Sequence, residues 1–266
     1  MEPSILLNKR SDGVAVLTLN RPGRLNAFNR EMIDSWRAAV EDAFADTAVR
    51  VLVVTGAGRA FCAGGDADEM NTLPDMDSMD KKNNLWEHIH RIAMAMDRSD
   101  KPVIAAVNGT ARGAGCDMAL MCDLRIAAQS ATFAESYIDF GLIAGDAGAY
   151  FLPRIVGVAR ALELFWTGRV VDSAEAERIG LVNRVVPDAQ LLDTALELAA
   201  LIASQPEKAV QMYKRTVYQS QAMALTTHLD MVSSHMAVLQ SSKDFRDRVA
   251  TFLQRKLKNL RKDKPA

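Results

Sequence analysis

The amino-acid sequence predicts an α/β fold with parallel strands, followed by a helical C-terminal region. Short apolar runs alternate with stretches of helical spacing between residues 51 and 186, and this alternation is typical of an α/β domain. From residue 188 the pattern changes to long helices, in which apolar residues such as Leu192, Ala195 and Leu198 recur at helical spacing. We therefore expect a core at residues 1–189 and a helical region at residues 190–266.

The first elements are predicted from alternation and from a capping residue. Segments 4–9 and 14–19 alternate on either side of Ser11-Asp12-Gly13, so they are expected to pair as strands. Asn29 is expected to cap a helix that runs to Ala45. Further strands are expected at 50–55, 103–107, 124–128, 132–134 and 182–186, and further helices at 79–98, 150–156, 159–167, 173–179, 190–204, 206–220, 226–240 and 243–260.

The composition excludes several classes of function. The chain has 266 residues, 49% of them apolar, and a formal net charge of −1 without a long basic tract, so no nucleic-acid partner is expected. Cys62, Cys116 and Cys122 lack CxxC or Cys/His spacing, which predicts reduced core thiols and no metal site. The N-terminus lacks the layout of a signal peptide, and no apolar run reaches membrane-spanning length. We expect a cytoplasmic protein without a membrane partner.

Two glycine-bearing stretches each follow a short β-rich run. Gly113–Gly115 comes between such a run and a helix-forming stretch, so its backbone N–H groups are expected at a helix start, where they lack intrahelical partners. Gly64-Gly65 offers a second amide that no side chain screens. Two such donors around one oxygen would each contribute about 2.7–4 kcal/mol when charge develops on it. The alternative is a pair of turns that need glycine for steric reasons alone.

These stretches, AFCAGGDADEM at residues 60–70 and KPVIAAVNGTARGAGCDMALMCD at residues 101–123, resemble the two signature regions of the crotonase (enoyl-CoA hydratase/isomerase) superfamily. The likeness continues, in order, in LNRP at 19–22, LNA at 25–27, LPR at 152–154 and GLV at 180–182, and covers about residues 14–186. It implies a crotonase-like core, a spiral of ββα turns, with a C-terminal α-helical oligomerisation region that forms a homotrimer or a dimer of trimers. It also implies an acyl-CoA substrate, coenzyme A being part of the substrate and no other cofactor being tightly bound.

By the same resemblance, the backbone N–H groups of Gly65 and Ala114 are the expected oxyanion hole. Ala114 stands where relatives often carry glycine, and its methyl group does not remove the N–H. The residues expected to bind the substrate and its coenzyme A portion are Arg24, Leu25, Ala27, Ala63, Gly64, Asp66, Ala67, Gly113 and Gly145.

The expected acid and base groups depart from the family pattern of two glutamates. Asp117 aligns with the first glutamate and Tyr137 with the second, while Asp146 lies in a glycine-flanked loop where several relatives carry an aspartate nearby. Each has a structural alternative: Asp117 as compensation for the helix dipole or as a helix cap, Tyr137 as an aromatic wall, and Asp146 as a loop hydrogen-bonding group. Glu135 would share the side of Tyr137 in an alternating strand.

The sequence therefore predicts an enzyme that stabilises a thioester enolate and moves protons with Asp117, Asp146 and Tyr137. Addition of water to 2-enoyl-CoA is the expected reaction. The alternatives are double-bond isomerisation, hydrolysis or C–C cleavage by a crotonase-type enzyme, and an acyl-CoA-binding protein without catalytic activity.

Overall fold

The computed structural model describes residues 2–262 and divides the chain into two compact units, the first ending at Ala203 and the second beginning at Ser204. The boundary expected after residue 189 precedes the helix α9 (Leu191–Ala203), whereas the division follows it. The physical reason is that α9 packs against the strands of the first unit and buries Leu191, Ala195 and Ala199 there. Residues 263–266 of the expected helical region lie outside the described residues.

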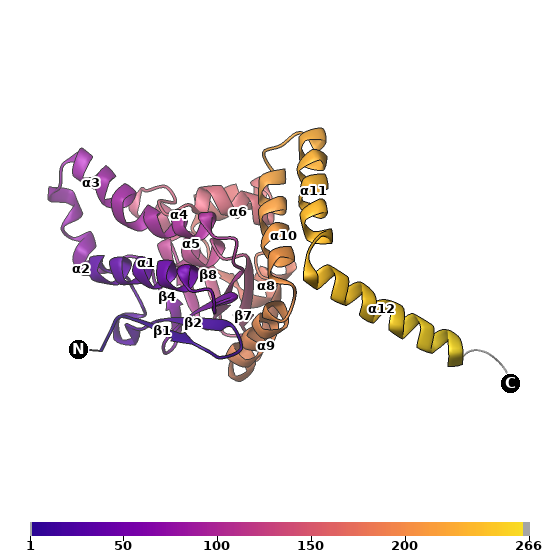
Figure 1. Ribbon diagram of the computed structural model, residues 1–266. Coiled ribbons are helices and arrows are strands. Elements are labelled where there is room, and N and C mark those ends of the chain that lie inside the picture. Colours follow the sequence, from indigo (N-terminus) through magenta and orange to yellow (C-terminus); the bar gives the residue numbers. More distant parts are fainter. Residues whose placement is uncertain (1, 263–266) are drawn as a thin grey trace. The chain divides into compact units, whose positions relative to one another are not determined.

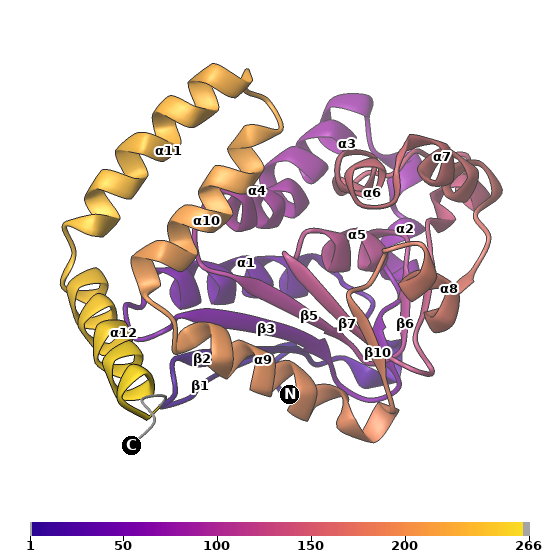
Figure 2. The ribbon, with the colours of Figure 1, turned by 90° about the vertical axis from the view of Figure 1, so that its right-hand side faces the viewer.

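The first unit contains a six-stranded sheet in the order β1-β2-β3-β5-β7-β10. Only β1 and β2 pair antiparallel in it; the other neighbours are parallel. Val51–Val54 and the whole of β5 are buried, as expected of parallel strands that are covered on both faces. Figure 2 shows the helix α1 on one face of this sheet and α9 on the opposite face. The strands are β1 (Ile5–Lys9), β2 (Val14–Leu19), β3 (Val51–Gly56), β5 (Val103–Val107), β7 (Leu124–Ala128) and β10 (Arg184–Val186).

A second sheet of four short strands has the order β4-β6-β8-β9. The strands β4, β6 and β8 run parallel to one another, and β9 pairs antiparallel with β8. Because the three parallel strands lie side by side, the loops after them meet at one edge. The strands are β4 (Ala60–Cys62), β6 (Thr110–Arg112), β8 (Thr132–Ala134) and β9 (Val171–Asp172).

Helices and single helical turns connect the strands of the first unit. The longer ones are α1 (Arg30–Ala45), α3 (Ser78–Asn84), α4 (His90–Arg98), α5 (Ala114–Leu120), α6 (Gly148–Val156), α7 (Val158–Thr167), α8 (Ser173–Arg178) and α9. The short turns are η1 (Pro22–Arg24), α2 (Ala67–Met70), η2 (Leu73–Asp75), η3 (Leu85–Ile89), η4 (Ser136–Phe140) and η5 (Asp188–Gln190).

The predicted α/β fold with parallel strands and C-terminal helices is confirmed, and so are several local predictions. The segments 4–9 and 14–19 form the antiparallel pair β1 and β2. Asn29 caps α1, and its side chain accepts a hydrogen bond from Met32 N at 3.1 Å. The three cysteines are buried as reduced thiols, as expected of core cysteines. The prediction of one uninterrupted helix at 79–98 was wrong in one respect. The π-helical turn η3 separates α3 from α4, although the three elements follow one another in the chain (Figure 1).

The second unit consists of the helices α10 (Glu207–Ser220), α11 (Leu225–Gln240) and α12 (Lys243–Lys262). The helices α10 and α11 pack side by side (Figure 1), and Thr216 Oγ1 lies 3.3 Å from His235 Nδ1 between them. Several large apolar side chains of this unit are exposed, among them Leu225, Leu229, Val238, Phe252 and Leu253. Within residues 2–262, no helix combines the length and the hydropathy that crossing a bilayer requires.

Candidate active site

The candidate site lies where the three parallel strands of the second sheet end. The strand β4 ends at Cys62, β6 at Arg112 and β8 at Ala134, and the pairing of these strands places their carboxyl ends next to one another. Such an edge is where ligands bind in open α/β sheets. It brings together the three segments that contain the predicted oxyanion amides and two of the three predicted acid–base residues: 63–66, 113–117 and 135–137.

The turn after β4 presents the backbone amide of Gly65. Phe28 N donates to Gly64 O, and Asp66 N donates to Phe28 O, both in an isolated parallel bridge between Phe28 and Gly65. In such a bridge the amide of Gly65 itself points away from Phe28. Gly64 has a φ of +97°, and a methyl group on it would lie 2.9 Å from Arg112 O, so glycine is required there.

The turn after β6 presents the backbone amide of Ala114. Ala114 is the first residue of α5 and follows the cap residue Gly113, so its N–H has no partner in the helix. The two turns touch, because a methyl group on Gly64 would lie only 3.6 Å from Ala114 N. Neither this amide nor that of Gly65 donates a hydrogen bond to another group in the described part of the chain. The arrangement leaves one unpaired backbone donor in each of two adjoining turns, and their role as an oxyanion hole stays a prediction.

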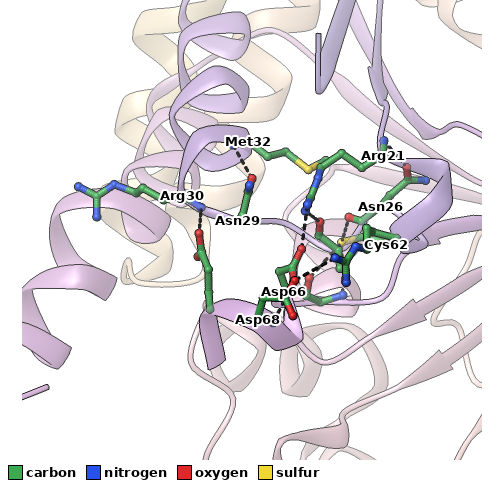
Figure 3. Close-up of polar contacts among 12 residues, drawn as sticks. Arg21, Asn26, Asn29, Arg30, Met32, Cys62, Asp66 and Asp68 are labelled. Atoms are coloured by element: carbon green, nitrogen blue, oxygen red, sulfur yellow. Dashed lines mark hydrogen bonds and ion pairs between the residues drawn. The ribbon is translucent and has the colours of Figure 1, made fainter. Parts of the chain in front are cut away.

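Polar contacts of Arg21, Cys62, Asp66 and Asp68, which Figure 3 labels, hold the segments on either side of the Gly64–Gly65 turn. The Asp66 carboxylate, only 4% exposed, forms an ion pair with Arg21 at 2.8 Å and caps α2 by accepting from Asp68 N. Burial acts against the charge of Asp66, but the hydrogen bonds from Asp68 and Arg21 outweigh it and lower the pKa of this carboxyl. Gly64 N donates a hydrogen bond to Cys62 Sγ at 3.4 Å, and burial raises the pKa of the Cys62 thiol to about 12.

Asp117 is completely buried one turn into α5, and its carboxylate faces the end of β8. Tyr137 donates its hydroxyl to Asp117 Oδ2 at 2.8 Å, and Asp146 N donates to the same oxygen at 3.1 Å. Gly113 occupies the N-cap position of α5, so Asp117 does not cap this helix. Asp117 lies in the first turn, where compensation of the helix dipole stays the alternative to a catalytic role. Burial raises the pKa of Asp117, and the hydrogen bond from Tyr137 opposes that rise.

Tyr137 links the two aspartates. Its hydroxyl also lies 3.2 Å from Asp146 Oδ2, and Asp146 is only 3% exposed. One hydroxyl proton makes one strong hydrogen bond, so a proton on Asp146 completes the chain Asp146–Tyr137–Asp117. Burial and the charge of Asp117 raise the pKa of Asp146 to about 7, which makes this proton exchangeable near neutral pH. Burial likewise raises the pKa of Tyr137, so its hydroxyl stays protonated.

The ring of Tyr137 lies between the two glycines predicted to line the substrate. A methyl group on Gly113 would lie 3.9 Å from Tyr137 Cε2, and one on Gly145 would lie 3.7 Å from Tyr137 Cε1. The ring of Tyr137 therefore forms a wall beside the Gly113–Ala114 turn, and its hydroxyl joins the carboxyls of Asp117 and Asp146. The structure brings together all three predicted acid–base residues; their catalytic role remains a prediction.

The prediction that Glu135 shares the side of Tyr137 assumed one alternating strand, which these two residues do not form. The strand β8 ends at Ala134, and the 3₁₀ turn η4 begins at Ser136, so the alternation stops before these residues. Glu135 is 2% exposed and lines an internal cavity with Phe133 and Leu152. Tyr137 remains half-buried at the site.

The residues expected to bind coenzyme A lie on two adjacent segments. Ala63 N donates to Leu25 O at 3.0 Å, which joins the turn 24–27 to the segment 63–67. Leu25 adopts a left-handed conformation with a φ of 51°, Ala27 is buried and Ala67 is exposed. Arg24 is exposed and forms a surface ion pair with Asp68 at 2.9 Å. Their contact with a ligand stays a prediction.

Two residues that support the site were not among those predicted. Arg21 balances the buried charge of Asp66; the sequence signal was an aspartate directly after a glycine pair, which needs a cation when it is buried. His90 donates through Nε2 to Gly145 O at 2.8 Å and packs edge-on against Trp86, so it holds the loop that carries Asp146. The sequence signal for this role of His90 is weak, since a single histidine in a helix can have many roles. Within the described range 2–262, no cluster of His, Cys, Asp and Glu is arranged to hold a metal.

Comparison with known proteins places this arrangement in a family. The family model described as enoyl-CoA hydratase/isomerase matches residues 9–262. The 1,2-epoxyphenylacetyl-CoA isomerase of Escherichia coli (strain K12) is 36% identical over 94% of this chain and 96% of its own length. The crotonyl-CoA hydratase of Syntrophomonas wolfei is 34% identical over 97% of both chains. The crystal structure of enoyl-CoA hydratase from Mycobacterium smegmatis superposes with a TM-score of 0.89 at 34% identity, covering 96% of this chain and 97% of that one. The chain therefore belongs to the enoyl-CoA hydratase/isomerase family.

Proposed function

We propose that this protein adds water to 2-enoyl-CoA thioesters through an enolate held by the amides of Gly65 and Ala114. The observation that carries the proposal is the Tyr137 hydroxyl, which lies within hydrogen-bond distance of both Asp117 and Asp146 beside the Gly113 turn. A relative named crotonyl-CoA hydratase supports the same reaction class.

The two amides act on the thioester carbonyl. As the oxygen of water bonds to C3 of the enoyl group, negative charge moves onto the thioester oxygen. Donors that are already in place bind this enolate more strongly than the neutral substrate, so they lower the barrier to addition. Each contributes about 2.7–4 kcal/mol, the range measured for single oxyanion donors. The coenzyme A portion lies along the segments 24–27 and 63–67.

Asp117 is the base. Its carboxylate accepts hydrogen bonds from Tyr137 and from Asp146 N, which makes it the better stabilised anion of the two aspartates. It takes a proton from the attacking water as the C3–O bond forms. Asp146 then gives its proton to C2 of the enolate, which completes the 3-hydroxyacyl thioester. The proton on Asp117 returns to Asp146 through the Tyr137 hydroxyl, and the site is reset.

The test is hydration of crotonyl-CoA, followed as the loss of enoyl-thioester absorbance. We expect turnover by the wild-type protein and a loss of at least ~100-fold in Asp117→Asn. If crotonyl-CoA and longer 2-enoyl thioesters bind without turnover, hydration is wrong. Exchange of deuterium into C2 of a saturated acyl-CoA then separates a proton-transfer enzyme from a binding protein, and release of free coenzyme A reveals hydrolysis.

Isomerisation of an enoyl-CoA double bond is the second candidate function. The favouring observation is that two carboxyls on separate elements share one hydroxyl, which allows a proton to leave one carbon and return to another without water. A relative named 1,2-epoxyphenylacetyl-CoA isomerase agrees with this reaction type. Conversion of a 3-enoyl-CoA to the 2-enoyl isomer, faster than hydration of the product, would favour it over hydration.

We also propose that the exposed apolar side chains of α11 and α12, such as Leu229, Val238 and Phe252, form contacts between copies of the chain in a trimer or a dimer of trimers. Burial of such side chains stabilises association. Light scattering is expected to give three or six times the chain mass of 29.1 kDa. Phe252→Glu should shift the mass downward; a monomeric wild-type protein would contradict the proposal.

A further inference from the structure

Glu135 is a buried carboxyl that the proposed reaction does not use. It directly follows β8, is 2% exposed, and lies next to Cys116 and Asp117 of α5. Among the residues that the structure describes, neither of its carboxyl oxygens has a hydrogen-bond partner, and the same holds for Asp117 Oδ1. A buried polar group without a partner is costly, so this pair of carboxyls requires an explanation.

The surroundings of Glu135 do little to stabilise a negative charge, because the neighbouring Cys116 thiol is only a weak hydrogen-bond donor. The carboxyl lines a cavity of about 10 Å³, which is the size of one water molecule at most. Arg169 contributes to the same lining, but its guanidinium is already paired with Glu163 and with Glu175, each at 2.8 Å. The other lining residues are Cys116, Phe133, Ala134, Leu152, Leu164, Val171 and Leu181.

The charges that face Glu135 favour its protonated form. Asp117 on α5 places negative charge near it, and Asp146 on the loop before α6 adds to this charge when it is ionised, while the Cys116 thiol and the Tyr137 hydroxyl are neutral. Burial and the charge of Asp117 raise the pKa of Glu135 to about 10. An ionised carboxylate can only accept hydrogen bonds, whereas a protonated one donates. One proton on Glu135 therefore supplies the donor that Asp117 Oδ1 lacks.

We propose that Glu135 is a protonated carboxylic acid at neutral pH, and that it donates its hydrogen bond to Asp117 Oδ1. Glu135 is thus a positioning residue: with Tyr137 on Oδ2 and Glu135 on Oδ1, both oxygens of the base have donors, and the carboxylate is held in one orientation. The catalytic part of this inference rests on the proposed role of Asp117, whereas the protonation of Glu135 does not.

Kinetics of two variants test the positioning role. Glu135→Gln keeps a neutral donor of the same shape, and Glu135→Leu removes it. In Glu135→Leu we expect kcat to fall by about 10- to 100-fold, the worth of a hydrogen bond to a charged group, with KM little changed. The acid limb of the kcat/KM profile should move upward by about one pH unit, because the ionised form of Asp117 loses a donor. In Glu135→Gln most of kcat and the position of the acid limb should be retained.

The opposite pattern would overturn the proposal. If Glu135 were ionised, Glu135→Gln would remove a negative charge next to Asp117 and shift the acid limb downward. If the side chain served packing alone, neither variant would move that limb.

Infrared spectroscopy tests the protonation without relying on activity or on a stable leucine variant. At pH 8.5, where Asp146 is ionised, the wild-type protein should show the carbonyl band of a buried carboxylic acid, and Glu135→Gln should lack it. Absence of the band from the wild-type protein would refute the protonation of Glu135, whatever the reaction proves to be. A band with no hydration activity would refute the proposed function alone.

Discussion

Gly148→Ala is expected to displace the Asp117 carboxylate, the proposed base, while leaving residue 117 itself unchanged. A methyl group on Gly148 would lie 1.9 Å from Asp117 Oδ1, whereas ordinary contact begins at 3.4 Å, so the carboxylate must move by about 1.5 Å. The 2.8 Å hydrogen bond from Tyr137 to Asp117 cannot survive a shift of that size. Misplacing a reacting group by about 1 Å costs on the order of 100-fold in rate.

We therefore predict that kcat for crotonyl-CoA hydration falls by at least ~100-fold in Gly148→Ala. The free energy of unfolding should fall by only about 1–3 kcal/mol, the usual cost of overpacking a buried site, so the variant still folds at 25 °C. The assay is kcat at saturating substrate, together with a denaturant titration of each protein.

Gly145→Ala is the matched control in the same loop. The added methyl group would lie 3.7 Å from Tyr137 Cε1, an ordinary contact, and Gly145 has no positive φ. Its kcat should stay within about threefold of the wild-type value, while KM is left free to change because Gly145 borders the predicted substrate site. A folded Gly148→Ala protein with wild-type kcat would refute the placement of Asp117 as the base.

Three further predictions concern the carboxyls of the site and their partners. Asp117→Asn should lower kcat by at least ~100-fold and change KM little, which steady-state kinetics will measure. The pKa of Asp146 is raised from 3.8 to about 7, so its contribution to stability is present below pH 4 and is lost as the pH rises through 7. The Tm of Asp146→Asn, relative to the Tm of the wild-type protein, should therefore increase between pH 4 and pH 8. A Tm difference that does not change with pH would contradict the raised pKa of Asp146. Arg21→Met leaves the buried Asp66 charge unpaired and should cost about 3–5 kcal/mol in chemical denaturation, whereas Arg24→Met, which breaks an exposed pair, should cost less than about 1 kcal/mol.

The sequence was sufficient to predict the local features of the site. Glycine at 64 and 113 marks turns that a side chain could not adopt, with φ values of +97° and +49°. The start of α5 after Gly113 could also be predicted, because a glycine before a run of helix-forming residues is a feature of the local sequence. The adjacency of the two turns followed only from the family resemblance, since the pairing of β4 with β6 joins segments about 50 residues apart.

The contacts among the acid–base residues could not be read from the sequence. Asp117, Tyr137 and Asp146 come from a helix, a 3₁₀ turn and a loop, and their meeting depends on tertiary packing. The alternating strand assumed for Glu135 and Tyr137 was wrong, because β8 is three residues long and ends before both of them. The π-helical turn at 85–89 was missed because its apolar spacing is close to that of an α-helix.

The central claim is that the amides of Gly65 and Ala114 bind one thioester oxygen. The most direct measurement is a crystal structure of the protein with a bound acyl-CoA product, such as 3-hydroxybutanoyl-CoA. We predict that both amide nitrogens lie about 2.7–3.1 Å from the carbonyl oxygen. A carbonyl oxygen more than about 3.5 Å from either nitrogen, in a complex that still turns over, would contradict the account.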